Sequence, residues 1–258
     1  MKFGIMNSPK KDLEKEIKYA FRNKFDFIDL TLEGKAVYNK ININEVKKLL
    51  NKYKKKDFFA IGHTSWYLTP GDELDEFREA TIKVMKKNLR IFSDLNINLV
   101  NIHLIAFSFL SKKETAENFI ETFKKLITMA KKYDIKIMIE NCEPSVDINM
   151  VGNVLKKVPD LKLHLDVGHA NLNYKKNKTE DYFRRFKNKI AHIHVSDNHG
   201  GKDDEHLGIG KGNINWKKIV KILKKYNYDK TITLETFKGS KNQCVRSKNK
   251  LKKLLGEE

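Results

Sequence analysis

Six positions in this 258-residue chain carry side chains that bind divalent metal ions, and each comes at the end of a short apolar run. Such runs are typical of buried parallel strands, so the six side chains are expected at strand ends. Imidazole nitrogens and carboxylate oxygens are the usual protein ligands of these ions, and their repeated placement predicts a metal centre. The six residues are His63, His103, Glu140, Asp166, His194 and Glu235.

Three further candidate ligands lie in the segments just beyond these strands. His169 follows Asp166 in an Asp-Val-Gly-His sequence, and Asp204 and His206 form an Asp-x-His pair. A carboxylate-rich set with one imidazole favours Mn²⁺, Mg²⁺ or Co²⁺, whereas the additional histidines shift the preference toward zinc. The sequence therefore leaves the metal open among Zn, Mn, Mg and Co. The remaining histidines are interpreted as structural or solvent-facing: His164, His192 and His199.

The elements that must position these residues alternate along the whole chain. Short apolar runs are followed by longer stretches of helical periodicity, of which Glu73–Asp94 is the most regular. The predicted strands are Lys2–Met6, Phe25–Leu32, Phe58–Gly62, Leu99–His103, Lys136–Glu140, Lys162–Asp166, Ile190–Val195 and Thr231–Glu235.

Eight strand and helix pairs in a chain of this length predict an α/β fold, a single (β/α)8 TIM barrel. An open doubly wound sheet would give a similar alternation, but it would not gather six strand ends at one point. In a barrel the C-terminal strand ends form one mouth, where active sites lie. No Pro/Gly/Ser-rich stretch divides the chain, so one domain over residues 1–258 is expected, with its metal site at that mouth.

The chain is strongly basic, with a formal net charge of +19 from 52 Lys and Arg against 33 Asp and Glu. Such a charge would attract nucleic acid, phosphates or acidic substrates. Most of the excess, however, consists of lysines on predicted helical faces, where solvated lysine is ordinary. We favour this second interpretation, and the charge alone does not identify a partner.

Composition also bears on location. Met1–Met6 leads directly into a predicted strand and has no long apolar region of a signal peptide. The most apolar stretch, Leu99–Leu110, is shorter than a membrane span and contains polar residues. Cys142 and Cys244 are the only cysteines, too few for a disulfide framework. A cytoplasmic protein that makes no membrane contact is expected.

Taken together, the motifs resemble those of the xylose isomerase-like TIM-barrel superfamily, which includes endonuclease IV, the ketose 3-epimerases and the inosose dehydratases. The segments that carry this resemblance span nearly the whole chain. They are Gly62-His63-Thr64-Ser65, Asn101-Ile102-His103, Ile139-Glu140-Asn141, Leu165-Asp166-Val167-Gly168-His169-Ala170, His192-Ile193-His194-Val195-Ser196-Asp197-Asn198, Asp204-Glu205-His206-Leu207-Gly208-Ile209-Gly210-Lys211-Gly212-Asn213-Ile214 and Leu234-Glu235-Thr236.

The first function that the resemblance implies is a divalent-metal-dependent isomerase or epimerase of a sugar or sugar phosphate. In the ketose epimerases, residues matching Glu140, Asp166, His194 and Glu235 hold one divalent cation, which polarises the substrate carbonyl. Glu140 and Glu235 would then remove and return a proton through an enediolate.

The resemblance also implies contacts with the substrate and a state of assembly. His169 would contact a substrate oxygen, and Trp66 would form an apolar wall of the pocket or pack in the core. Lys211 would meet a phosphate or acidic group, although a solvated turn is the interpretation we favour. Barrels of this group often pair, so a homodimer is an expected assembly.

The second function that the resemblance implies is a zinc-dependent phosphodiesterase that cuts DNA at abasic sites, as endonuclease IV does. All nine candidate ligands match the residues that hold three zinc ions in that enzyme, and Trp66 would wedge into an opened duplex. Two loops depart from its pattern: Leu104-Ile105-Ala106 replaces a Pro-Gly-Ser turn and Asn141-Cys142-Glu143-Pro144 replaces a Thr-Ala-Gly segment. These departures favour the sugar reaction.

A third function, a barrel that binds a polyanion or a partner protein without turnover, is the least favoured. Converging carboxylates and imidazoles are costly to bury unless a metal ion neutralises them, so folding alone gives no reason for them.

Overall fold

The computed structural model of the chain describes residues 1–34, 41–106, 109–142 and 146–257. Glu143 and Pro144, which belong to one of the two loops that depart from the endonuclease IV pattern, lie outside the described residues.

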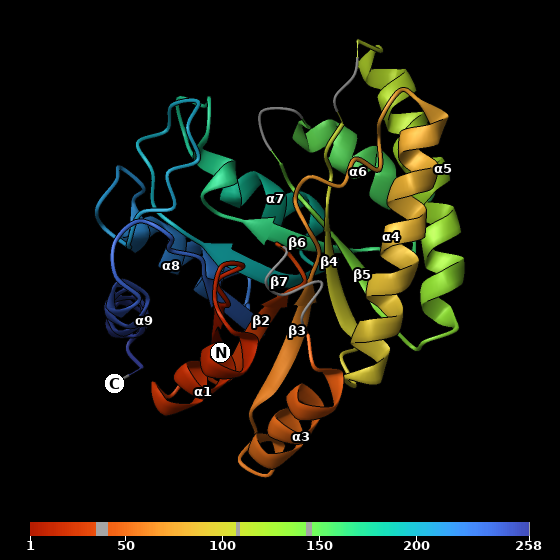
Figure 1. Ribbon diagram of the computed structural model, residues 1–258. Helices are drawn as coiled ribbons and strands as arrows, with labels where there is room; N and C mark the ends of the chain where they lie inside the picture. Colours follow the sequence, from red (N-terminus) through yellow and green to blue (C-terminus); the bar gives the residue numbers. More distant parts are fainter. Residues whose placement is uncertain (35–40, 107–108, 143–145, 258) are drawn as a thin grey trace.

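Eight parallel strands close into a barrel in which each strand pairs with the next and β8 pairs with β1. The predicted TIM barrel is therefore confirmed (Figure 1). The strands are β1 (Lys2–Met6), β2 (Phe27–Thr31), β3 (Phe59–His63), β4 (Leu99–His103), β5 (Lys136–Glu140), β6 (Lys162–Asp166), β7 (Ile190–Val195) and β8 (Thr231–Leu234).

Helices surround the barrel and connect the strands, with α4 and α5 side by side along one flank and α8 and α9 on the opposite flank (Figure 1). Their starts follow ordinary capping chemistry, as in the capping box that Ser111 and Glu114 form at the start of α5. The helices are α1 (Leu13–Arg22), α3 (Ile43–Lys54), α4 (Asp75–Asp94), α5 (Lys112–Lys131), α6 (Ile148–Lys157), α7 (Thr179–Phe186), α8 (Trp216–Lys225), α9 (Asn242–Leu255) and the short 3₁₀ helix η1 (His169–Asn171).

Most predicted boundaries agree with the structure, and three strands and one helix differ by one or two residues. Strand β2 begins at Phe27, because the N–H of Phe25 bonds to the carbonyl of Ala20 at the end of α1. Strand β3 includes His63, and β8 ends one residue before Glu235. Helix α4 begins two residues later than predicted, at Asp75.

Apolar side chains pack in two separate places. The larger core lies between the strands and the surrounding helices, where Phe92 of α4 sits so close to Gly62 that an added Cβ would come within 2.9 Å of its ring. A second, small cluster, which we call the floor, is formed by Phe27, Ile61 and Met138. Because side chains alternate along a strand, the residues two positions further along each of these strands face the same interior.

Two further observations concern membrane-spanning helices and the cysteines. None of the helices in the described ranges is both long and apolar enough to cross a membrane. Cys142 and Cys244 are both buried.

Candidate metal centre

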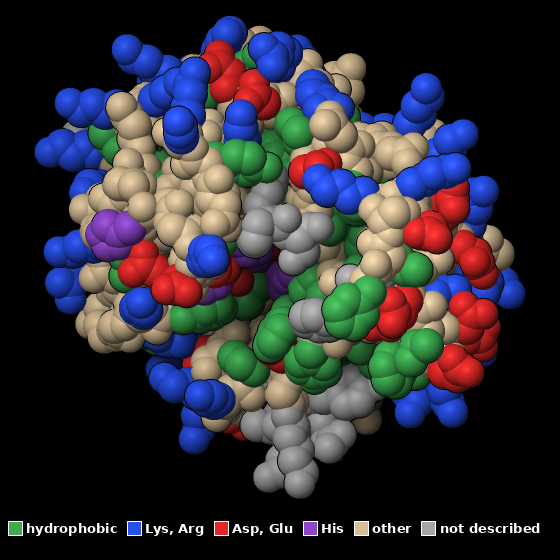
Figure 2. Space-filling view, turned by 90° about the horizontal axis from the view of Figure 1, so that it is seen from above, with side chains coloured by type: hydrophobic (Ala, Val, Ile, Leu, Met, Phe, Trp, Pro, Cys, Tyr) green, Lys and Arg blue, Asp and Glu red, His purple; other side chains and the backbone are tan. Residues whose placement is uncertain are grey.

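The strand ends surround a cavity of about 790 Å³ at the C-terminal mouth of the barrel. Figure 2 shows the hollow from above, with histidine and acidic side chains at its centre. Seven of the nine candidate ligands line it directly, and Asp166 and His194 lie buried just beneath them. The seven are His63, His103, Glu140, His169, Asp204, His206 and Glu235.

Glu140, at the end of β5, is the centre of a first group of candidate ligands. Its Oε2 lies 3.3 Å from Nε2 of His103 and 3.7 Å from Nε2 of His63. The same oxygen accepts a hydrogen bond from Nδ2 of Asn101 in β4. One ligand atom from each of His63, His103 and Glu140 lies within 4.8 Å of the other two, which is close enough for one metal ion to contact all three.

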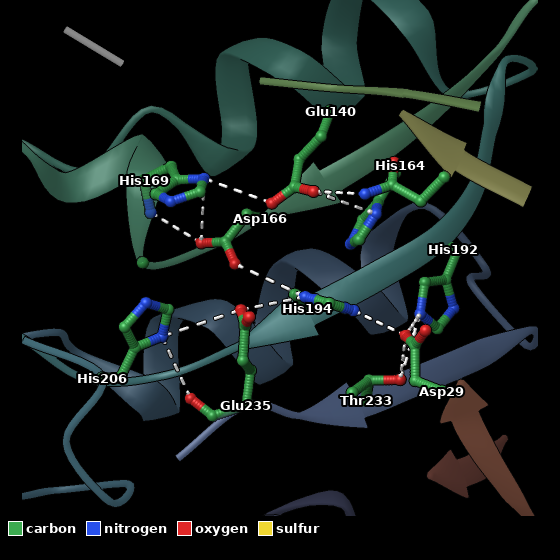
Figure 3. A network of polar contacts seen from close by, with 12 residues as sticks. Asp29, Glu140, His164, Asp166, His169, His192, His194, His206, Thr233 and Glu235 are labelled. Atoms are coloured by element: carbon green, nitrogen blue, oxygen red, sulfur yellow. Dashed lines mark hydrogen bonds and ion pairs between the residues drawn. The ribbon is translucent and has the colours of Figure 1, made fainter. Parts of the chain in front are cut away.

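A second group forms around His194 of β7. Its Nδ1 lies 2.9 Å from Oε2 of Glu235 and 4.0 Å from Oδ2 of Asp166 (Figure 3). Glu140, Asp166 and His194 also offer ligand atoms that lie within 4.8 Å of one another. This group contains the four residues on which the epimerase resemblance depends.

A third group is built from the loops above the barrel. Oδ2 of Asp204 lies 3.0 Å from Nε2 of His169 and 2.7 Å from Nε2 of His206. On its other side His169 approaches Glu140, with 3.3 Å between Nδ1 and Oε1. The three groups therefore share residues and form one continuous cluster.

Local backbone contacts hold the second and third groups together. The amide side chain of Asn141 both accepts a hydrogen bond from the N–H of Asp166 at 2.7 Å and donates one to its carbonyl at 3.1 Å. One turn later, the N–H of His169 donates to Oδ1 of Asp166 at 2.6 Å. Gly168 is required between them, because a Cβ there would lie 2.5 Å from Oγ of Ser196.

The carboxylates of the cluster respond differently to burial. Burial raises the pKa of Glu140, but the neighbouring His164 and His103 outweigh it and hold that pKa well below its usual range. Burial also raises the pKa of Asp166, to about 7, and the nearby carboxylates of Glu235 and Glu140 add to the shift. At neutral pH Glu140 is therefore ionised, whereas Asp166 is partly protonated.

The pKa values of the histidines are also shifted in both directions. Burial lowers the pKa of His103 to about 4. For His206 the carboxylates of Glu235 and Asp204 outweigh burial and raise the pKa to about 9. Burial is likewise overcome in His169 and His194, whose pKa values lie well above the usual range because carboxylates surround them. Protons on these histidines thus balance the buried negative charge, and a divalent cation would replace them.

The donor set fits a divalent metal ion. Several of its nitrogen and oxygen atoms are buried and have no hydrogen-bond partner among the described residues, and buried polar atoms of this kind need a partner. Imidazole and carboxylate groups at 3–4 Å from one another are what Zn²⁺, Mn²⁺ and Co²⁺ bind. The atoms are Nε2 of His63, Nδ1 of His103, Oδ2 of Asp166 and Oδ1 of Asp204.

Of the predicted substrate-binding residues Trp66 and Lys211, Trp66 lines the cavity and Lys211 does not. Trp66 lines the cavity with 52% of its surface exposed, and its indole N–H donates a hydrogen bond to the half-buried Glu33. Lys211 is exposed in a turn, where its N–H bonds to the carbonyl of Gly208, and it is not among the residues that line the cavity. This position gives no support to a phosphate contact at Lys211, the interpretation that the sequence did not favour.

The histidines that were not expected to be ligands also have defined places. His199 is exposed beside Glu205. His164 and His192 are buried inside the barrel, where Nδ1 of His164 lies 3.5 Å from Oε2 of Glu140.

The sequence analysis missed one buried carboxylate, that of Asp29 in β2, which contacts His192 and His194. The available signal was a charged residue in the middle of the apolar run Phe27–Thr31. It also missed Phe237 and Lys10, which line the cavity from loops with no distinctive pattern.

The chain is similar to proteins of more than one kind. It is 30% identical over 244 residues to an uncharacterized protein of Methanocaldococcus jannaschii, a match that covers 91% of this chain and 92% of that protein. It is 24% identical over 193 residues to a probable endonuclease 4 of Aquifex aeolicus, over 66% of this chain and 68% of that protein.

Among solved structures, the crystal structure of a D-tagatose 3-epimerase-like protein superposes with a TM-score of 0.87 and 26% sequence identity, over 99% of this chain and 97% of that one. The family model described as the xylose isomerase-like TIM barrel matches residues 17–254, and the chain belongs to that family.

Proposed function

We propose that this chain is a divalent-metal-dependent isomerase or epimerase that moves a proton on the carbon beside the carbonyl of a ketose sugar. The observation that carries the proposal is the arrangement of Glu140 and Glu235, which reach toward the same space from opposite sides with Asp166 and His194 between them (Figure 3). The likeness to a D-tagatose 3-epimerase-like protein supports the choice of substrate class.

The two glutamates would carry out the proton transfer. Despite burial, which raises it, the pKa of each is lowered, by His164 and His103 for Glu140 and by His194 and His206 for Glu235, so both are ionised and able to accept a proton. One would take the proton from the carbon on one face of the substrate, and the other, after taking up a proton from solvent, would deliver it on the opposite face, which inverts that carbon. A divalent cation bound among Glu140, Asp166, His194 and Glu235 supplies a Lewis acid that polarises the carbonyl.

The walls of the cavity favour a neutral sugar over a phosphate ester. Lys10 is the one lysine or arginine among the described residues that line the cavity, although the chain carries 52 such residues. Figure 2 shows that most lysine and arginine side chains on this face lie toward its periphery. Phosphate recognition normally needs several cations or a bidentate arginine, so an uncharged polyol fits this mouth better.

A second candidate function, incision of DNA at abasic sites, is favoured by the His63, His103 and Glu140 group. A single-cation epimerase has no evident need for that group, and the similarity to a probable endonuclease 4 agrees with it. The shortage of cations around the cavity argues against it, because most of the affinity for DNA comes from contacts with phosphates.

Exchange of solvent deuterium into a ketose tests the first function. Protein loaded with Mn²⁺, Co²⁺ or Zn²⁺ is incubated in D₂O with D-tagatose or D-fructose, and loss of the C3 proton signal is followed by NMR. We expect metal-dependent exchange that falls about 10²–10⁴-fold in Glu235→Gln, since a general acid and base contributes about that much. Glu180→Gln, a change of the same type on the exposed face of α7, is the matched control and should exchange at the normal rate.

The same preparations are tested for nicking of a labelled duplex that contains one abasic site. Metal-dependent nicking that is lost in Glu235→Gln, without deuterium exchange into either sugar, would replace the first function by the second.

A further inference from the structure

Beneath the mouth, the barrel interior contains a carboxylate where an apolar layer is usual. Asp29 lies in the middle of β2 and is fully buried. One of its oxygens, Oδ2, lies 2.7 Å from Nε2 of His194, 3.2 Å from Nε2 of His192 and 2.9 Å from Oγ1 of Thr233 (Figure 3). The interior layers of TIM barrels are generally filled by bulky branched side chains, so this polar layer calls for a specific reason.

Stability does not supply that reason. A buried ionic group usually contributes no more to stability than a well-packed apolar side chain of similar volume. Three groups that can donate a hydrogen bond surround one oxygen of Asp29: Nε2 of His194, Nε2 of His192 and the hydroxyl of Thr233. This carboxylate oxygen is therefore placed as an acceptor.

This contact determines which nitrogen of His194 keeps its proton when a metal ion displaces the other. Because the carboxylate oxygen of Asp29 accepts at 2.7 Å, Nε2 of His194 is the donor. The opposite nitrogen, Nδ1, is the one that faces Glu235 and Asp166 in the cluster. A histidine that binds a metal ion does so through its unprotonated nitrogen, and its second ring nitrogen commonly donates to a carboxylate that sets the ring orientation.

We propose that Asp29 is a positioning residue that holds His194 with Nδ1 directed at the metal site and Nε2 protonated. The inference rests on the metal site of the proposed function and not on the identity of the substrate. Asp29 also contacts Nε2 of His192, and Nδ1 of that histidine is itself anchored 2.7 Å from Oγ1 of Thr231 in β8.

Metal affinity measures this role without any substrate. Metal-free wild-type protein, Asp29→Asn and Thr233→Val are titrated with Co²⁺, and dissociation constants are obtained by competition with a chelator. We expect Asp29→Asn to bind Co²⁺ about 10- to 100-fold more weakly, which is the usual effect of removing such a partner. Thr233→Val is the matched control: it removes one hydrogen bond to Asp29 but leaves the contact with His194, and should stay within about threefold of wild type.

A second measurement needs no substitution at Asp29 and holds even if that variant does not fold. Long-range ¹H–¹⁵N NMR of the Zn²⁺-loaded wild-type protein, with His194→Gln to assign the signals, should find Nε2 of His194 protonated and Nδ1 bound to metal. The reverse assignment would overturn the inference. So would Co²⁺ affinity in Asp29→Asn that matches the wild type, or an equal loss in Thr233→Val.

The two proposals fail in different ways. Asp29-dependent Co²⁺ binding without sugar exchange supports the positioning role and removes the proposed reaction. Sugar exchange together with an unchanged Co²⁺ affinity in Asp29→Asn supports the proposed reaction and removes the positioning role.

Discussion

The floor and the mouth of the barrel interior are built by the same strands and differ sharply in chemistry. In β5, Met138 lies in the floor and Glu140 in the mouth, and in β3 the corresponding pair is Ile61 and His63. Each pair is two residues apart, so both members face inward. One strand therefore serves two purposes within about 7 Å of its length, because each residue adds about 3.3 Å.

The two regions make opposite contributions to stability. Apolar burial in the floor favours folding by roughly 25 cal/mol for each Å² removed from water. In the mouth, burial of carboxylates and imidazoles is unfavourable unless protons or a cation balance their charges. We therefore expect substitutions in the floor to change stability and substitutions in the mouth to change activity.

The largest effect is expected from Glu140→Gln in the mouth. Loss of this carboxylate should lower the rate of deuterium exchange by about 10²–10⁴-fold, because a proton acceptor and a ligand are removed together. The metal-free variant should unfold at the same temperature as the metal-free wild type or higher, as measured by circular dichroism. A large loss of stability would mean that the mouth, like the floor, supports the fold.

A floor substitution should show the reverse pattern. Met138→Ala removes a fully buried side chain and is expected to lower the free energy of unfolding by about 2–5 kcal/mol in urea titrations. Its affinity for Co²⁺ should remain within about threefold of wild type, because the substitution leaves all nine candidate ligands in place. Weakening of metal binding comparable with that of Asp29→Asn would show that the two regions are coupled.

Removal of the metal ion should affect the stability of floor and mouth variants differently. A bound cation at 100 to 1,000 times its dissociation constant stabilises a protein by about 2.7–4.1 kcal/mol. Chelation should therefore lower the stability of wild type and Met138→Ala by the same amount, and that of Glu140→Gln by much less. Thermal unfolding with and without chelator measures the loss of stability in each of the three proteins. An equal loss in all three would place the bound metal outside the mouth.

The mouth should also make metal binding depend on pH. In the metal-free protein the raised pKa values of Asp166, about 7, and His206, about 9, mean that both hold protons in acidic solution. Metal binding must displace these protons, so affinity should rise with pH by about tenfold per unit for each proton displaced. Co²⁺ titrations between pH 6 and 9 test this, and Met138→Ala should give the same slope.

Much of the fold was predictable from sequence, because helical and strand periodicities are local. Leu99–His103 and Lys136–Glu140 were predicted with the observed boundaries, since a run of apolar residues bounded by polar ones needs no tertiary information. The ends of β2 and α4 were less accurate, because hydrogen bonds to neighbouring turns decide where such elements begin.

The candidate site was predictable to the extent that it follows from the strand ends. Once the barrel is assumed, residues such as His103 and Glu235 must converge, and the structure brings all nine candidate ligands into one cluster. For Lys211, by contrast, the Gly-Lys-Gly setting allowed a phosphate contact as well as the solvated turn that we favoured, and the fold places it outside the cavity lining. Its position depends on how a long loop packs, which no local pattern reveals.

What the sequence alone determined was therefore the barrel, its residue types and the end of each strand at which the chemistry lies. Tertiary structure alone decided which atoms face one another. Asp29 and His194 are 165 residues apart, and nothing local links them. They meet because closing eight strands into a barrel brings the inward face of β2 opposite that of β7, and a hydrogen bond across that interior depends on the closed geometry.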